Sequence, residues 1–273
     1  MKTIIVPVDF SEQSEYALQF AAEIARNQQA EILALHMLEM SPALLSTGDT
    51  APSENVVFLL KLAEKRFSDF LNKDYLQGVS ITPVIKHFKV FSEINEIAEE
   101  QGADLIIMGS HGTDGLEEIF IGSNTEKVVR SSTVPVLVVK ERHSDFSIDR
   151  FVFACDFEAE SVEAAKKAQR MAELFGAEFL LVYINTPNDA FLSTQDAYNK
   201  ISAFLVLARM GKEVEVYNDY TIEKGILNYA ESVSADLIGI PTHGRKGLSH
   251  FLLGSISEDL ANHSSLPVVT FKI

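Results

Sequence analysis

Residues 103–140, ADLIIMGSHGTDGLEEIFIGSNTEKVVRSSTVPVLVVK, return in altered form as residues 235–272, ADLIGIPTHGRKGLSHFLLGSISEDLANHSSLPVVTFK. The two stretches align without a gap and are identical at fifteen positions. The identical pairs include His111/His243, Gly112/Gly244, Gly115/Gly247, Gly122/Gly254, Ser123/Ser255 and Pro135/Pro267. Self-similarity on this scale indicates that one structural unit occurs twice in the chain.

The beginnings of the two units also align, at a different offset. IIVPVDFSEQSEYAL matches FVFACDFEAESVEAA and pairs Asp9 with Asp156, and the offset changes because the middle of the first unit is longer. We therefore predict one domain over residues 1–141 and a second over residues 149–273. The boundary lies in the polar run of residues 141–149, ERHSDFSID.

The composition is that of a globular protein with an acidic surface. Of the 273 residues 47% are hydrophobic and 23% are charged, and the formal net charge is −16. Such a charge argues against nucleic acid and anionic membranes as partners, because both are bound through Lys and Arg. The single cysteine excludes a disulfide within the chain. The N-terminus, MKTIIVPVDF, has no apolar core of signal-peptide length, so we expect a cytoplasmic protein.

Short apolar runs alternate with segments of helical periodicity, which predicts an α/β fold. Between the first two runs, Ala17, Phe20, Ala21, Ile24 and Ala25 recur at helical spacing and indicate a crossover helix. Strands that are almost continuously apolar are covered on both faces, so the sheet is expected to be mostly parallel. In the first half the expected strands are Thr3–Val8, Glu31–His36, Ser80–Lys86, Asp104–Met108 and Val136–Val139.

The candidate ligand-binding residues follow the ends of predicted strands. Asp9 and the run MGSHG, residues 108–112, both lie at strand carboxyl ends, where parallel sheets bind ligands. Gly122 and Ser123 begin the next predicted helix, whose free N–H groups and dipole favour an anion. Glycine in such a loop lets the backbone approach a ligand closely, because it has no Cβ.

The pattern G-x2-G-x9-G-S over residues 109–123, with VPVDFSEQSEYAL before it and VPVLVV after it, resembles the universal stress protein family. The resemblance covers nearly the whole chain, twice. It implies two tandem Rossmann-like domains similar to adenine-nucleotide α-hydrolases, each with a five-stranded parallel sheet flanked by helices. It also implies that Val136–Val139 and Val268–Phe271 pair within the chain as an intrachain pseudo-dimer. A homo-dimer of the whole chain and an unidentified protein partner are compatible with this arrangement.

Many family members with the intact glycine pattern bind ATP or another adenine nucleotide, so the resemblance implies a regulatory or protective nucleotide-binding protein. Carried over by position, it places Pro7, Val8, Asp9 and Met37 beside the adenine. It places Met108, Gly109, His111 and Gly112 along the adenine and ribose. Gly122, Ser123, Asn124 and Thr125 would hold the phosphates.

Each half departs from the family pattern at one place. The second half has Pro241 where the first glycine belongs, and proline lacks an N–H, so we expect weak or no nucleotide binding there. The first half carries Asp114, Glu117 and Glu118 in the loop before Gly122. Carboxylates near phosphate are unfavourable, so the site is expected to need Mg²⁺ or to prefer a nucleotide with fewer phosphates.

Several alternatives remain open at this level. The glycines can serve as turn formers, and Asp9 can cap a helix instead of contacting a ligand. There is no G-x-x-x-x-G-K-[ST] phosphate loop, no nucleophile elbow and no metal-ligand spacing of histidines, so we assign no catalytic residue and no metal site. Hydrolysis of ATP would at most be slow. The competing functions are a nucleotide-independent scaffold for a protein or apolar ligand, and an enzyme of the wider adenine-nucleotide-binding group.

Overall fold

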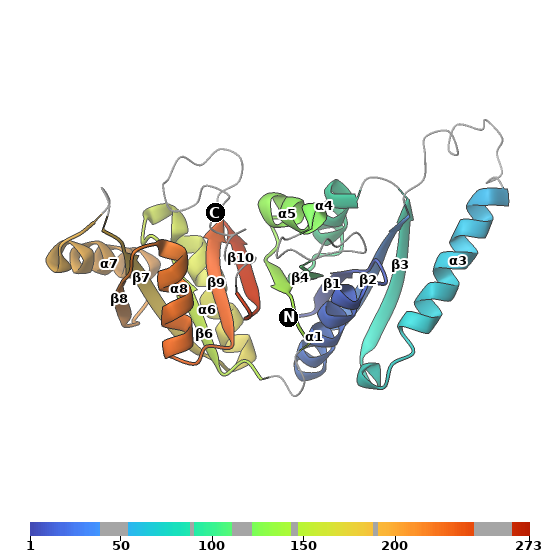
Figure 1. Cartoon of the computed structure of the whole chain (residues 1–273), viewed down its shortest axis with the longest axis horizontal. Helices are drawn as coiled ribbons and strands as arrows, with labels where there is room; N and C mark the ends of the chain where they lie inside the picture. Colours follow the sequence, from blue (N-terminus) through green and yellow to red (C-terminus); the bar gives the residue numbers. More distant parts are fainter. Residues whose placement is uncertain (39–53, 88–89, 111–121, 143–146, 188–190, 243–263) are drawn as a thin grey trace.

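The computed structural model describes residues 1–38, 54–87, 90–110, 122–142, 147–187, 191–242 and 264–273 (Figure 1). The described strands form one ten-stranded sheet in the order β3-β2-β1-β4-β5-β10-β9-β6-β7-β8. The strands are β1 (Thr3–Pro7), β2 (Glu31–Leu38), β3 (Ser80–His87), β4 (Leu105–Gly109), β5 (Val136–Val139), β6 (Arg150–Ala154), β7 (Glu178–Asn185), β8 (Val214–Asn218), β9 (Leu237–Thr242) and β10 (Val268–Lys272). The helices are α1 (Glu12–Gln28), α3 (Glu54–Phe70), α4 (Val90–Glu100), α5 (Ser123–Ser131), α6 (Val162–Phe175), α7 (Thr194–Ala208) and α8 (Ile222–Ser232), with 3₁₀ turns η1 (Asp74–Leu76) and η2 (Ala159–Ser161).

Each half of the sheet is a five-stranded parallel unit, as the sequence predicts. The order β3-β2-β1-β4-β5 in the first half is repeated as β8-β7-β6-β9-β10 in the second. The five strands expected in the first half all form, with ends within two residues of the predicted ones. The mixed α/β fold and its two related halves are therefore confirmed.

The two halves meet at an antiparallel pair formed by the last strand of each. Val268 of β10 lies opposite Val138 of β5, and Thr270 lies opposite Val136. The Thr270 hydroxyl also donates to the Val136 carbonyl at 3.3 Å. The pairing of these strands within one chain, implied by the family resemblance, is thus present in the structure.

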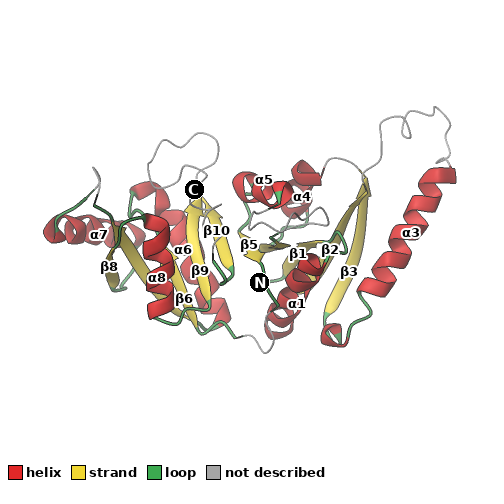
Figure 2. Cartoon of the chain, viewed as in Figure 1, coloured by secondary structure: helices red, strands yellow, loops and turns green. Residues whose placement is uncertain are grey.

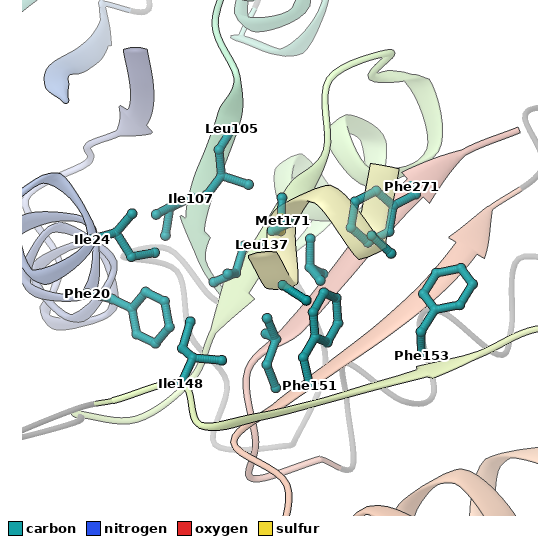
Figure 3. Packing of buried hydrophobic residues seen from close by; sticks show 14 of the residues in the cluster. Phe20, Ile24, Leu105, Ile107, Leu137, Ile148, Phe151, Phe153, Met171 and Phe271 are labelled. Carbon is teal, nitrogen blue, oxygen red and sulfur yellow. The ribbon is translucent and has the colours of Figure 1, made fainter. Parts of the chain in front are cut away.

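Helices cover both faces of the sheet (Figure 2). One face carries α1, α3, α6 and α7, which all contribute buried residues to a single apolar cluster spanning both halves. Figure 3 shows its centre, where Phe20 and Leu137 of the first half approach Phe151, Met171 and Phe271 of the second. The opposite face has two separate clusters, one under α4 and α5 and the other under α8. Because one core crosses the β5–β10 pair, the two halves are packed against each other by more than strand hydrogen bonds.

The long helices α3 and α7 lie at opposite ends of the molecule, beside the edge strands β3 and β8 (Figure 1). Within the described ranges, no helix is both long enough and apolar enough to cross a membrane.

Candidate functional site

The candidate site of the first half lies where β1, β2 and β4 end and α5 begins. β1 is flanked by β2 and β4, and all three run parallel, so their carboxyl ends share one edge of the sheet. Asp9 follows β1, Met37 lies near the end of β2, and Ser110 follows β4. The predicted residues His111 and Gly112 lie outside the described residues, as do the acidic loop residues Asp114, Glu117 and Glu118.

The turn after β1 is built by Asp9. Its Oδ1 accepts hydrogen bonds from the Ser11 backbone N–H, at 3.0 Å, and from the Ser11 hydroxyl. Ser11 is the N-cap of α1, and its hydroxyl oxygen in turn accepts from the Ser14 N–H at 3.2 Å. Asp9 is therefore not the cap itself but orients the residue that is. This local role accounts for an aspartate here, and a contact of Asp9 with a ligand stays a prediction.

Phe10 adopts a left-handed backbone conformation, with φ of 66°. This conformation is unfavourable for a bulky residue and persists only when its surroundings hold it. The Phe10 ring packs against His36 at 4.5 Å and against Phe67 of α3 at 5.3 Å, measured between ring centroids. The Arg66 guanidinium lies 6.0 Å from the Phe10 ring centroid. The turn at the candidate site is thus tied to both β2 and α3.

His36 joins the ends of β1 and β2. Its Nδ1 lies 2.7 Å from the Val8 carbonyl oxygen, and because a carbonyl only accepts, Nδ1 carries the proton. Burial is the main cause that lowers the pKa of His36 below its usual 6.5, and the charge of Arg66 acts in the same direction. The bond to Val8 and the charge of Asp9 oppose this shift. At neutral pH the uncharged ring therefore holds the Val8 carbonyl.

Gly109 is explained by packing against the first turn of α1. A Cβ atom at this position would lie 2.7 Å from both the carbonyl carbon and the carbonyl oxygen of Gln13. Carbon atoms in ordinary contact are about 3.5–4.0 Å apart, so only glycine fits without displacing the helix backbone. The backbone approaches something closely at Gly109, and in the structure that neighbour is α1.

The start of α5 is fastened to the end of β4. The Gly122 N–H donates to the Ser110 carbonyl at 2.6 Å, and the buried Thr125 hydroxyl donates to the Gly109 carbonyl at 3.0 Å. The two ends of the intervening loop are therefore adjacent. Asn124, in the first turn of α5, is exposed.

The N-cap of α5 is Gly122, which has no side chain to satisfy the helix, and no side-chain cap is present there in the described structure. The first N–H groups of a helix have no partner within the helix, and the helix dipole adds partial positive charge at this end. An anion such as phosphate is the ligand that this arrangement suits.

The other predicted residues differ in how far their side chains are buried. The side chains of Val8 and Met108 are buried in the two cores on opposite faces of the sheet. Pro7, Asp9 and Met37 are half-buried. Ser123 is the first residue of α5. The contribution of Phe10 and His36 was not predicted, although the alignment held a signal, since Phe157 and Tyr183 occupy the matching positions of the second half.

The second half has the same turn after β6, with its aspartate more deeply buried than Asp9. Phe157 is also left-handed, with φ of 55°, and Asp156 Oδ1 accepts from the Glu158 N–H at 3.1 Å. Asp156 is only 6% exposed, and its Oδ1 also accepts from the buried Ser161 hydroxyl at 2.7 Å. In the first half the equivalent Ser14 bonds to the Ser11 backbone instead.

Glu158 also links the turn after β6 to α7. Its carboxylate forms an ion pair with Lys200 of α7 at 2.7 Å, and the Lys200 ammonium lies 5.8 Å from the ring centroid of Tyr183. Across the described ranges, no group of three or more His, Cys, Asp or Glu side chains could hold a metal ion.

Comparison with known proteins gives the same family for both halves. The model of the universal stress protein family matches residues 1–140 and again residues 147–272. Universal stress protein MJ0577 of Methanocaldococcus jannaschii is 36% identical over 157 residues, covering 52% of this chain and 97% of that protein. A universal stress protein of Mycolicibacterium smegmatis is 23% identical over 289 residues, covering 98% of this chain and 96% of that protein.

Among solved structures, the universal stress protein from Archaeoglobus fulgidus superposes with a TM-score of 0.71 at 23% identity. The superposition covers 99% of this chain and 96% of that one. At this level of identity the likeness concerns the fold, including its arrangement over the full length of the chain.

Proposed function

The chain belongs to the universal stress protein family, with two copies of the family domain in tandem, and we propose that its first half binds an adenine nucleotide. The observation that carries this proposal is the uncapped N-terminus of α5 beside the end of β4, with Gly122 as its N-cap. In the proposed mode the phosphates lie over Gly122, Ser123, Asn124 and Thr125. The base lies between the Asp9 turn and Met37.

The role we propose for this binding is regulatory or protective. The Asp9 turn contacts α3 through the Phe10 ring, so a ligand resting on the turn would also act on that helix. We infer that nucleotide occupancy alters the surface offered to a partner protein. No residue is assigned to catalysis.

The second half is proposed not to bind nucleotide. Its Asp156 is only 6% exposed and binds the buried Ser161 hydroxyl, whereas Asp9 in the first half is half-buried. Pro241 also replaces the first glycine of the motif. We expect one nucleotide per chain.

The test is isothermal titration calorimetry of the full chain with ATP, ADP and AMP, each with Mg²⁺ and with EDTA. Gly122→Val is expected to abolish binding, because a β-branched side chain would crowd the first-turn N–H groups. The backbone of Gly122 has φ of −56°, which valine adopts without strain, so folding should be retained. Gly254→Val, at the aligned position of the second half, is the matched control and is expected to bind one nucleotide as the parent does.

Two results would contradict the proposal. One is a folded parent protein that binds none of the three nucleotides with or without Mg²⁺. The other is a Gly122→Val variant that binds as tightly as the parent, which would place any binding site elsewhere.

A second function, a scaffold that works without nucleotide, is favoured by exposed apolar side chains on α3. Phe58 is 66% exposed, and Val57 and Leu62 are also exposed near the same end of the helix. Two results together would favour this scaffold: the parent protein binds no nucleotide, and Phe58→Ser alters its association with other proteins.

A further inference from the structure

The C-terminal end of α5, a helix of the first half, is contacted by the second half of the chain. The Lys272 ammonium, at the end of β10, donates to the Ser131 carbonyl at 3.2 Å and to the Arg130 carbonyl at 3.4 Å. These carbonyls belong to the last turn of α5. The contact links residues 141 and 142 positions apart in sequence and crosses the junction between the two halves.

Lys272 is itself placed firmly by the sheet. It pairs with Thr242 in the register of β10 and β9, and the Ile273 N–H donates to the Thr242 carbonyl at 3.0 Å. The residue is half-buried, while the contact of its ammonium with α5 is exposed to solvent. The second half therefore presents this cation to α5 from a rigid strand.

α5 is short and is held along its length. Nine residues span about 13 Å at 1.5 Å per residue. Its N-terminus is bonded to β4 by Gly122 and Thr125, while Val128 and Val129 are buried against the sheet. Movement at one end of such a helix is passed to the other end, because the helix is rigid and its middle is packed.

We propose that Lys272 is a positioning residue for the nucleotide site of the first half. The inference rests on the proposed function. A cation at the last carbonyls and an anion at the first N–H groups both interact favourably with one helix dipole. Lys272 thus holds α5 in the orientation in which its N–H groups face the phosphates, and adds favourable electrostatics along the same axis. By this contact the second half supports binding in the first without binding nucleotide itself.

The experiment compares three variants of the full chain by calorimetry with the nucleotide that the parent binds most tightly. Lys272→Met keeps the apolar stem and removes the charge, and it is expected to weaken binding by about two- to fivefold. Lys272→Arg keeps a cation and is expected to restore affinity to within about twofold of the parent. Thr270→Val is the matched control, because it removes a hydrogen bond of the same junction and leaves the α5 carbonyls bonded.

Separate readouts distinguish positioning from stability. Urea unfolding of each variant reports the stability of the junction, and we expect Thr270→Val to lose stability with unchanged affinity. Hydrogen exchange of the α5 amides is expected to rise in Lys272→Met and not in Lys272→Arg. The affinity difference between parent and Lys272→Met should shrink at high salt, because the contact is solvent-exposed.

The outcomes are distinct from those for the proposed function. A parent that binds nucleotide, with Lys272→Met binding equally well, overturns the positioning role alone. Equal weakening by Thr270→Val and Lys272→Met also overturns it, because a general loosening of the junction would then explain both. A parent that binds no nucleotide overturns both proposals.

Discussion

Substitution of Gly109 by alanine tests the reason for the first glycine of the motif. The added Cβ would lie 2.7 Å from two backbone atoms of Gln13 and 2.9 Å from its Cβ. Relief to ordinary contact needs roughly 0.8 Å of movement or more. These atoms belong to the first turn of α1. Further along the same helix Ala17, Leu18 and Ala21 are fully buried, so the helix cannot move away without disturbing the core.

The expected cost follows from this overlap. Overpacking of a well-packed site costs about 1–3 kcal/mol, so we expect Gly109→Ala to lose about 2 kcal/mol of unfolding free energy. In proteins of this size that is a fall in Tm of roughly 4–8 °C. Urea and thermal unfolding of the full chain measure it. Gly211→Ala is the control, because a Cβ at Gly211 meets nothing within 4 Å and its φ is not positive, and its stability should stay within about 0.5 kcal/mol of the parent.

A double variant sharpens the test. Ser11→Ala removes the N-cap of α1 and weakens the first turn that carries Gln13. If the clash lies in that turn, the double variant Ser11→Ala, Gly109→Ala should lose less stability than the two single variants together. A Gly109→Ala variant as stable as the parent would refute the packing explanation. If that stable variant had also lost nucleotide binding, the glycine would be present for the ligand instead.

Three further outcomes are expected. Burial raises the pKa of the Cys155 thiol, so Ellman's reagent at pH 8 should leave the folded protein unlabelled and react in urea; rapid labelling of folded protein would show that the strand opens. Burial lowers the pKa of His36, so the stabilisation by the neutral ring is fully present above the usual pKa of 6.5 and is lost as the pH falls below it. In urea unfolding, the stability of His36→Gln should therefore change less between pH 7 and pH 5 than that of the parent. An equally steep profile in that variant would assign the dependence to other groups. Thr125→Val removes the hydroxyl that donates to the Gly109 carbonyl and should lower the free energy of unfolding in urea by about 1–3 kcal/mol. Thr125→Ser keeps the hydroxyl and should retain most of the stability. Equal losses in both variants would mean that the methyl group, not the hydroxyl, matters.

Much of the fold was predictable because the chain contains its pattern twice. Apolar runs flanked by polar residues located the first-half strands, and the repeat showed which segments are equivalent. The antiparallel pairing of Val136–Val139 with the last strand came from the family resemblance, since two short apolar runs carry no information about their partner.

The candidate site was predictable as a set of positions and less so as a set of roles. The carboxyl ends of parallel strands must meet at one edge, so Asp9 and the residues after Met108 were expected to be neighbours. The Phe10 and His36 contact was not expected, because a left-handed phenylalanine depends on tertiary packing that no local pattern encodes. The packing role of Gly109 was hidden for the same reason, as it depends on where α1 begins.

The two halves also differ in where the first helix of each begins. In the first half Ser11 caps the helix, α1 begins at Glu12, and its first turn leaves no room for a side chain at Gly109. In the second half Glu158 stands at the Ser11 position and makes no side-chain cap, so a 3₁₀ turn comes first and α6 begins only at Val162.

Pro241, at the position of Gly109, is buried in β9. The packing that explains Gly109 depends on the early start of α1, so Pro241 is the weaker of the two arguments against nucleotide in the second half. The stronger argument against nucleotide in the second half is Asp156, whose buried carboxylate is already bonded to Ser161. Ser161→Ala removes this bond but leaves Asp156 buried, so we expect the variant still to bind one nucleotide per chain. Calorimetry is the measurement. A second bound nucleotide in the variant, absent from the parent, would show that the Ser161 bond alone had blocked the second site.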